Sequence, residues 1–327
     1  RVIDVGSVDH AAAWKCNSTG GNCALTQLPE GGAGRSVGNG VACDTSGICL
    51  AVGVKGSPEQ PAAWVYNGVM WTAESVPLPG GFTGGSIRLV TDTLDGILNV
   101  AGSGTAFTAV GDTVNPGGFR KATYWKRNAQ GAWSVFLLLD FGVPGRESVA
   151  TDLVQCDVNS PPSICANGEL LIAGMAVDGP GISRPVVWRE TGPFTGTFIT
   201  TPFPLPAGAV GVIAYEWDWN LDLTQYGPSA AVFLTETEVM ADGTTRGVVW
   251  KTADLQTWSS AVLPPLQGRA NTRLTGNDFD LIATGGAYEL QAYFGSSTPT
   301  DGAFTAVWGH KPIKIIFVLP TPLLATR

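Results

Sequence analysis

Two tryptophans that flank a carboxylate are the residues of this sequence that best fit a binding site. Trp217 and Trp219 stand on either side of Asp218 in the stretch YEWDWN. In an extended chain the two indole rings point to the same side, where they could stack on a sugar or anchor a protein interface. Packing of both rings against neighbouring structure is the alternative interpretation. Trp217, Asp218 and Trp219 are therefore candidate binding residues.

Catalytic chemistry finds little support in the residue types. Nucleophilic catalysis of the Ser-His-Asp or Cys-His kind needs a positioned base, and His10 and His310 are the two histidines of the chain. Glycoside hydrolysis needs two carboxyl groups about 5–10 Å apart. Several acids could take part, but their spacing selects no pair: Glu216, Asp218, Asp222, Glu236 and Glu238. The sequence assigns no catalytic residue.

The six cysteines fall into three pairs that are close in sequence, namely Cys16 with Cys23, Cys43 with Cys49, and Cys156 with Cys165. Structural zinc is the competing interpretation, but it needs four closely spaced ligands, and the chain has two histidines. We therefore predict three disulfides and no metal site. Each would contribute on the order of 2–3 kcal/mol and indicates an oxidising compartment.

Polar residues mark the predicted turns. Asn17-Ser18-Thr19 has the form of a glycosylation sequon, which predicts modification of Asn17 where the source glycosylates. Five aspartates recur at equivalent turns: Asp44, Asp92, Asp157, Asp218 and Asp278. Aspartate caps tight turns by accepting bonds from nearby backbone N–H groups, so a structural role is expected. Calcium is an open alternative because oxygen ligands are plentiful, although no Asp-x-Asp-x-Asp loop is present.

A recurring tryptophan defines the larger architecture. Six dipeptides carry it: Ala13-Trp14, Ala63-Trp64, Tyr124-Trp125, Val187-Trp188, Val249-Trp250 and Val307-Trp308. The spacings are 50, 61, 63, 62 and 58 residues, which suits a four-stranded unit and indicates a propeller or solenoid. We predict an all-β, six-bladed β-propeller with about four antiparallel strands per blade. It forms a single domain over 1–327, with approximate blades 1–46, 47–95, 96–160, 161–222, 223–279 and 280–327.

Each unit offers three further strands around its tryptophan strand. The expected partner strands upstream are Val2 to Gly6, Leu50 to Gly53, Leu98 to Gly102, Leu170 to Gly174, Ala231 to Leu234 and Leu281 to Ala283. The expected third strands are Trp71 to Pro79, Trp133 to Leu139, Phe198 to Pro206, Trp258 to Pro265 and Ile313 to Pro320. A fourth, outer strand is expected at Ser86 to Thr91, Ser148 to Gln155, Gly211 to Tyr215 and Ala270 to Gly276. On this scheme each blade comes from contiguous chain, and the ring closes by packing between blades.

Composition narrows the function classes. The chain has 43 Gly and 22 Pro, which favours short strands joined by turns. Its net charge of -8 and lack of a basic run argue against nucleic acid. The most apolar segment, residues 315–325, is too short to span a bilayer and contains two prolines. Because Val2 to Gly6 already fits a strand, we expect a mature or trimmed form.

The repeat is similar to that of a known family. A turn with Asp and Gly, a run ending in Val-Gly, Ala-x-x-Trp, and a strand ending in Leu-Pro resemble the HAF-repeat extracellular proteins, most closely over Ala42 to Gly80. The resemblance implies a secreted β-propeller-like protein. Thr252 to Trp258 also resembles the Asp-box of sialidase-type propellers, without its central glycine. That box implies a turn stabiliser, and no arginine cluster or nucleophilic tyrosine accompanies it.

These observations favour a non-catalytic extracellular propeller that acts as a protein-interaction or structural subunit of a surface or extracellular assembly. Charged residues make up only 14% of the chain, compared with about a quarter in typical soluble domains, and such a surface suits an assembled protein. We expect a secreted, periplasmic or cell-surface location and no cofactor. The alternative is carbohydrate binding or glycoside processing at one mouth of the propeller, near Trp217 and Trp219.

Overall fold

The computed structural model of the chain describes residues 2–3, 9–16, 23–29, 34–44, 47–92, 106–140, 145–156, 160, 162–192, 195–213 and 232–262. Beyond these it describes the strands within 273–278, 283–284, 287–288, 292–297, 304–309 and 318–320. Every regular element in this part of the chain is a β-strand, so it holds no helix that could cross a membrane. The all-β prediction is confirmed.

Five four-stranded antiparallel sheets follow one another along the chain. The first holds β5 (Ser36–Cys43), β6 (Cys49–Lys55), β7 (Gln60–Tyr66) and β8 (Trp71–Glu74); the second β9 (Gly84–Asp92), β10 (Phe107–Val114), β11 (Arg120–Arg127) and β12 (Trp133–Leu137). The third holds β13 (Ser148–Gln155), β14 (Leu170–Val177), β15 (Ser183–Glu190) and β16 (Phe198–Pro202); the fourth β17 (Ala209–Ile213), β18 (Val232–Met240), β19 (Thr245–Thr252) and β20 (Trp258–Val262). The fifth holds β21 (Arg273–Asp278), β24 (Ala292–Ser297), β25 (Phe304–Gly309) and β26 (Val318–Pro320).

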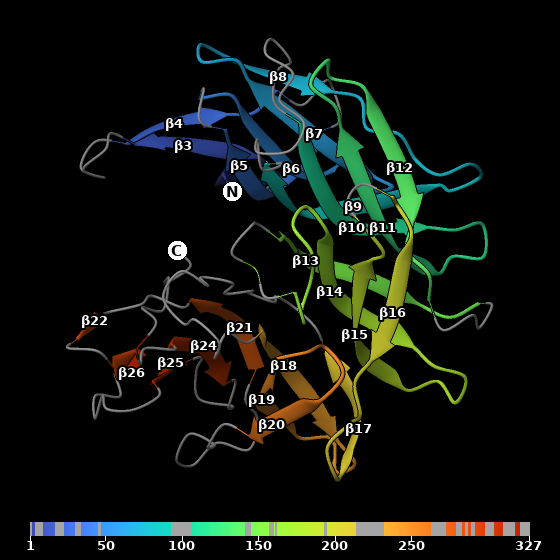
Figure 1. Cartoon of the computed structure of the whole chain (residues 1–327). Helices are drawn as coiled ribbons and strands as arrows, with labels where there is room; N and C mark the ends of the chain where they lie inside the picture. The colour runs from blue at the N-terminus through green and yellow to red at the C-terminus, as the bar shows by residue number, and fades with distance from the viewer. Residues whose placement is uncertain are drawn as a thin grey trace.

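Three two-stranded pairs complete the described strands. They are β1 (Val2–Ile3) with β2 (Asp9–His10), β3 (Ala12–Cys16) with β4 (Cys23–Gln27), and β22 (Ala283–Thr284) with β23 (Ala287–Tyr288). Figure 1 shows the sheets arranged in an arc, with β3 and β4 at one end and β24 to β26 at the other. This arrangement is propeller-like. In the described part the first unit forms two-stranded pairs, so a count of six blades stays a prediction.

The strands group differently from the expected scheme. The predicted outer strands Ser86 to Thr91, Ser148 to Gln155, Gly211 to Tyr215 and Ala270 to Gly276 correspond to β9, β13, β17 and β21, each of which is the first strand of the next sheet. The outermost strands are instead β8, β12, β16, β20 and β26. Backbone hydrogen bonds decide which neighbour a strand joins, and the pattern of side chains does not encode that choice.

Three predicted partner strands are wrong. β1, the described part of Val2 to Gly6, pairs with β2, whereas β3, which carries Trp14, pairs with β4. The strand paired with the Trp125 strand is β10 rather than Leu98 to Gly102, and the strand paired with the Trp308 strand is β24 rather than Leu281 to Ala283. In the last two cases another run that contains a glycine lies nearer to the tryptophan in sequence. This run forms a hairpin with the tryptophan strand, and the connection between the two has an ordinary length. The corresponding glycines, Gly111 and Gly295, stand 14 and 13 residues before their tryptophan.

These glycines have a specific packing role. Gly53, Gly111 and Gly174 each face a bulge in the first strand of their sheet. A Cβ atom there would lie 1.9–2.0 Å from the carbonyl oxygen of Val37, Ser86 and Val149, respectively. Glycine is therefore required where the bulged strand approaches most closely, and this explains why the apolar runs end in Gly.

The hydrophobic cores lie between neighbouring sheets. One joins Leu50, Val52 and Ala63 of the first sheet to Phe107 and Trp125 of the second. Equivalent cores join the second sheet to the third and the third to the fourth, and a smaller one joins Ala11 and Leu28 to Trp64. Because the first sheet is covered on both faces, its central strands β6 and β7 are each buried over five consecutive residues rather than at alternate positions.

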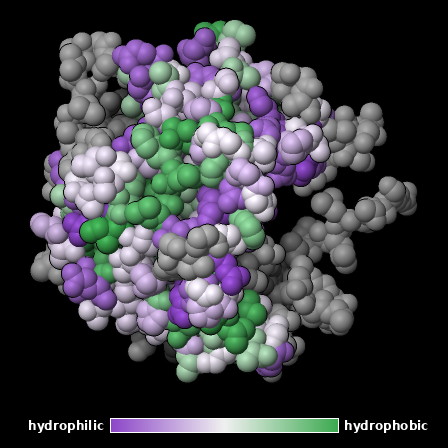
Figure 2. Space-filling model, turned by 90° about the vertical axis from the view of Figure 1, so that its right-hand side faces the viewer, coloured by the Kyte–Doolittle hydropathy of each residue, from purple (hydrophilic) through white to green (hydrophobic). Residues whose placement is uncertain are grey.

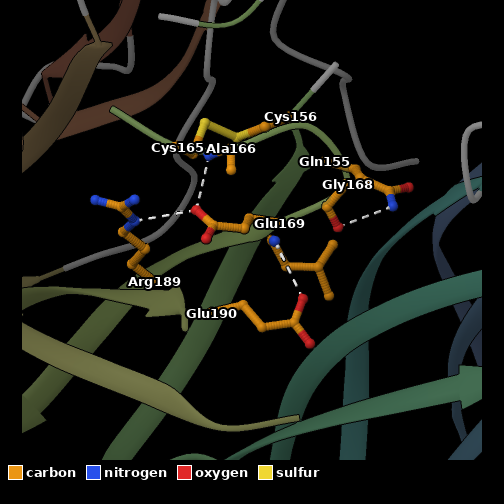
Figure 3. The surroundings of a disulfide bond; sticks show 9 residues. Gln155, Cys156, Cys165, Ala166, Gly168, Glu169, Arg189 and Glu190 are labelled. Atoms are coloured by element: carbon orange, nitrogen blue, oxygen red, sulfur yellow. Dashed lines mark hydrogen bonds and ion pairs between the residues drawn. A yellow bond between two sulfur atoms is a disulfide. The ribbon is translucent and has the colours of Figure 1, made fainter. Parts of the chain in front are cut away.

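Disulfides and polar caps close the hairpins. Cys16 is bonded to Cys23, Cys43 to Cys49, and Cys156 to Cys165. Figure 3 shows the last pair beside Glu169, whose carboxylate accepts bonds from the backbone N–H of Ala166 and from Arg189. Such covalent closure of short loops fits a protein that folds in an oxidising compartment.

Candidate interaction surface

The structure describes only some of the candidate residues that the sequence analysis named. Trp217, Asp218 and Trp219 lie outside the described residues, as do Asn17 and Asp157, so carbohydrate binding near the tryptophan pair stays a prediction. Asp92 and Asp278 end β9 and β21. Asp44 caps the β5–β6 turn, where its Oδ1 accepts a bond of 2.8 Å from the Ile48 N–H.

Other turns use the same device. The Oδ1 atoms of Asn115 and Asn128 accept N–H bonds within their hairpins, and that of Asp178 accepts one from Ile182. Asp254, in the Asp-box-like stretch, accepts bonds from the N–H groups of Gln256 and Thr257. The next residue, Leu255, has a φ of 58°. A leucine here adopts the left-handed conformation that glycine would adopt without cost.

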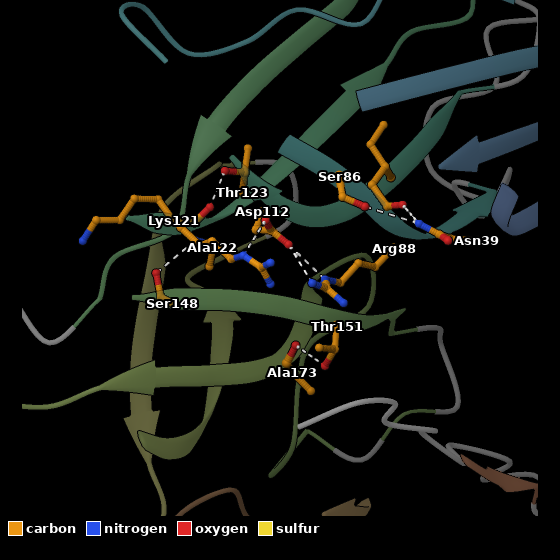
Figure 4. Close-up of polar contacts among 12 residues, drawn as sticks. Asn39, Ser86, Arg88, Asp112, Lys121, Ala122, Thr123, Ser148, Thr151 and Ala173 are labelled. Atoms are coloured by element: carbon orange, nitrogen blue, oxygen red, sulfur yellow. Dashed lines mark hydrogen bonds and ion pairs between the residues drawn. The ribbon is translucent and has the colours of Figure 1, made fainter. Parts of the chain in front are cut away.

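Several buried or partly buried carboxylates in the described part form ion pairs with basic side chains. Asp112 lies 2.9 Å from Arg88, and Glu74 binds Arg127 through two bonds of 2.7 Å. Figure 4 shows that Asp112 and Arg88 belong to a set of polar contacts on strands of the second sheet and its neighbours. No three His, Cys, Asp or Glu side chains gather there as a metal site, as far as the chain is described. These acids stabilise the sheets by pairing.

Glu238 is a partial exception to this pattern. Its Oε2 accepts a bond of 2.6 Å from Arg246, while its buried Oε1 has no hydrogen-bond partner. Burial raises the pKa of Glu238 above its ordinary value, and the pairing with Arg246 opposes that shift without cancelling it. A carboxylate that is fully covered by protein offers no access to a substrate.

Tyr124 is likewise unsuited to nucleophilic chemistry. Its hydroxyl group is buried without a hydrogen-bond partner. Burial, followed by the negative charge of Glu190, raises the pKa of the Tyr124 phenol far above its usual range. The ring stacks on Phe136, at 4.8 Å between centroids, and meets Phe198 edge-on, at 5.1 Å. Tyr124 therefore acts as a packing residue between the second and third sheets.

The recurring tryptophans also connect sheets. Trp64, Trp125 and Trp188 are fully buried, and each indole N–H donates to a backbone carbonyl that precedes it by 35 to 49 residues. The acceptors are Pro29, Pro77 and Leu139, at 2.7, 2.9 and 2.6 Å. Each acceptor follows the outermost strand of the preceding unit. Trp64, Trp125 and Trp188 are thus structural residues.

An exposed apolar surface remains at the outer edges of the second and third sheets. We define the outer-edge cluster as Phe136 and Leu137 on β12, Leu139 just after it, and Ile199 on β16. Their exposed fractions are 38%, 46%, 64% and 59%. Figure 2 looks onto this side of the molecule and shows a band of hydrophobic residues across it.

The cluster lies on both sides of the boundary between the second and third sheets, above a buried aromatic contact. Phe136 contacts Tyr124, which in turn contacts Phe198, the neighbour of Ile199. The Thr200 hydroxyl donates a bond of 3.0 Å to the carbonyl of Leu139. This bond links β16 to the segment just after β12, where Leu137, Leu139 and Ile199 remain exposed. Exposed large apolar side chains gathered in one region are typical of protein-interaction sites.

Comparisons with known proteins identify no family. No protein-family model matches the chain, and no curated protein matches it. Among solved structures, the chain is similar to a Trypanosoma rangeli sialidase in complex with sialic acid, with a TM-score of 0.43 and 10% sequence identity. The alignment covers 93% of this chain and 56% of that chain. The chain thus spans little more than half the length of that sialidase.

Proposed function

We propose that the protein is a non-catalytic, extracellular β-propeller-like protein that binds other proteins as a subunit of a surface or extracellular assembly. The observation that carries this proposal is the outer-edge cluster. Its four large apolar side chains are 38–64% exposed on adjacent sheets. Burying them against a partner would release ordered water and stabilise the complex.

The edges themselves support protein contact. β12 and β16 are the last strands of their sheets, and each pairs with one neighbouring strand in the described part. Such an edge presents backbone N–H and C=O groups to which a strand of another protein can add. Apolar side chains beside it would then supply the contact area.

The disulfides and the composition support the proposed extracellular location. Three disulfides favour a protein outside the cytosol. Only 14% of the residues are charged, and a surface with so little charge suits binding to other proteins better than it suits a freely dissolved monomer. Membership among the HAF-repeat proteins stays a prediction.

The test is a comparison of two double variants in the native source. Leu139→Asp with Ile199→Asp places charge in the centre of the outer-edge cluster. Polypeptides that accompany the wild-type protein in fixed ratio after mild isolation should be lost from this variant, because an unpaired carboxylate at an apolar interface is costly. Size measurement and mass spectrometry quantify the accompanying polypeptides.

The matched control changes exposed apolar residues elsewhere. Val69 and Met70, in the β7–β8 turn, are 85% and 57% exposed, so Val69→Asp with Met70→Asp adds the same charge away from the cluster. This control should retain the accompanying polypeptides. The proposal is overturned if the wild-type protein is isolated alone, or if the Leu139/Ile199 variant, folded by circular dichroism, keeps its partners.

A further inference from the structure

The starting observation is that Trp14 departs from the other repeat tryptophans. Among the five whose side chains are described, Trp64, Trp125, Trp188 and Trp250 are at most 2% exposed, whereas Trp14 is 64% exposed. Leu25 lies opposite Trp14 in the register of β3 and β4 and is 44% exposed. A large ring and an aliphatic side chain therefore face solvent on the first hairpin.

The buried tryptophans show what covers this position in the other units. Trp64, Trp125 and Trp188 each pack on the unit that precedes them and donate the indole N–H to one of its carbonyls. The residue before each acceptor is a buried or partly buried aliphatic side chain: Leu28, Val76 and Leu138. In each of these contacts, an aliphatic residue directly precedes the residue whose backbone carbonyl accepts the indole N–H bond.

The last sheet carries the same pattern at a similar distance. The acceptors Pro29, Pro77 and Leu139 stand 13 to 15 residues after the tryptophan of their own unit. Pro320 follows Leu319 at the end of β26 and stands 12 residues after Trp308. The hairpin of β3 and β4 and the sheet that ends in β26 occupy the two ends of the arc in Figure 1.

We propose that Trp14 docks on the last sheet of the same chain, where its indole N–H donates to the backbone carbonyl of Pro320. The contact continues the interface that already joins three pairs of neighbouring units. It closes the arc into a ring without exchanging a strand. A segment of the same chain is favoured over a second copy because its effective concentration is far higher. The proposal does not depend on the outer-edge cluster.

The direct test is photo-crosslinking from position 14. In the protein with Trp14→p-benzoylphenylalanine, light should join position 14 to the tryptic peptide that begins at Ile315 and contains Leu319 and Pro320, within one chain. A product of twice the chain mass would show a second copy at this surface and overturn the proposal. A link to any other peptide would also overturn it. Val69→p-benzoylphenylalanine is the exposed control and should leave the last sheet unlinked.

Stability provides the second measurement. If Trp14 is docked, Trp14→Phe removes one hydrogen bond and should lower the folding equilibrium constant roughly tenfold, similarly to Trp188→Phe. The denaturation midpoint should not depend on protein concentration. A Trp14→Phe variant as stable as the wild-type protein, alongside a weakened Trp188→Phe variant, would show that Trp14 is free in solution and would contradict the proposal.

Discussion

At the scale of single residues, Glu74, which is partly buried, and Glu238, which is fully buried, have pKa values shifted in opposite directions by their surroundings. Burial alone would raise the pKa of Glu74, but its hydrogen bonds with Arg127 and Trp133 and the charge of Arg127 outweigh burial, so the pKa lies below its ordinary value. Glu238 also has an arginine partner, yet burial prevails and its pKa is raised. Arg127 and Trp133 together donate three bonds to Glu74, whereas Arg246 donates one to Glu238.

The first prediction concerns Glu74. A lowered folded-state pKa means that ionised Glu74 stabilises the folded protein above the ordinary pKa of 4.5, and that this contribution is lost as the pH falls through the lowered value. Glu74→Gln should therefore cost about 2 kcal/mol at neutral pH and progressively less below about pH 4. Urea unfolding at a series of pH values measures both.

The control for Glu74 is an exposed pair. Glu59 lies 3.3 Å from Arg35, and about half of each side chain is exposed, so Glu59→Gln should change the free energy of unfolding by less than about 1 kcal/mol. An undiminished difference between the wild-type protein and Glu74→Gln in acid would show that the ion pair is not the source of the effect.

At the scale of elements, each of the first three four-stranded sheets places a glycine opposite a bulge. Gly174 pairs with Ala150, where the register of β13 shifts, and an added Cβ would lie 2.0 Å from the Val149 oxygen and 2.9 Å from the Trp188 ring. Both neighbours are fixed, one by the strand ladder and the other by its bond to Leu139. Neither can move without weakening the contact between sheets.

We predict that Gly174→Ala will destabilise the protein by about 3 kcal/mol or more, because overpacking here displaces backbone rather than a flexible side chain. Gly179→Ala is the matched control: no heavy atom lies within 4 Å of its added Cβ, so its effect should stay within about 0.5 kcal/mol. Thermal denaturation followed by circular dichroism compares the two variants. Equal melting temperatures would disprove the steric role assigned to Gly174.

At the scale of the whole molecule, apolar cores between successive sheets hold the described units together, and charge keeps the molecules apart. The chain carries a net charge of -8 at pH 7 and has a pI of about 4.8. Repulsion between copies therefore fades as the pH approaches the pI, while the outer-edge cluster stays exposed.

This arrangement predicts pH-dependent self-association. Light scattering should rise toward pH 4.8 and fall again in stronger acid, since net charge returns with the opposite sign. The Leu139→Asp, Ile199→Asp variant should scatter less at the same distance from its own pI, and the Val69→Asp, Met70→Asp variant should behave as the wild-type protein does. If the two variants scatter equally, the outer-edge cluster is not the surface through which copies associate.

The sequence by itself determined the class of fold and the main covalent features. Recurring tryptophans and apolar runs that end in glycine indicate an all-β repeat protein, because these patterns follow from local strand and turn chemistry. Local spacing was also enough to pair the six cysteines as the structure bonds them. Asp44 could be assigned to a turn for the same reason, since its partner Ile48 is four residues away.

Only the tertiary structure decided how the strands are grouped and which surface is exposed. The bond from Trp188 to Leu139 spans 49 residues, and β9 joins the strand after it rather than the one before. Leu138 and Leu139 are adjacent and identical in type, yet one is buried and the other is exposed. Burial depends on what the neighbouring sheet covers, and that is a property of packing between distant segments rather than of local sequence.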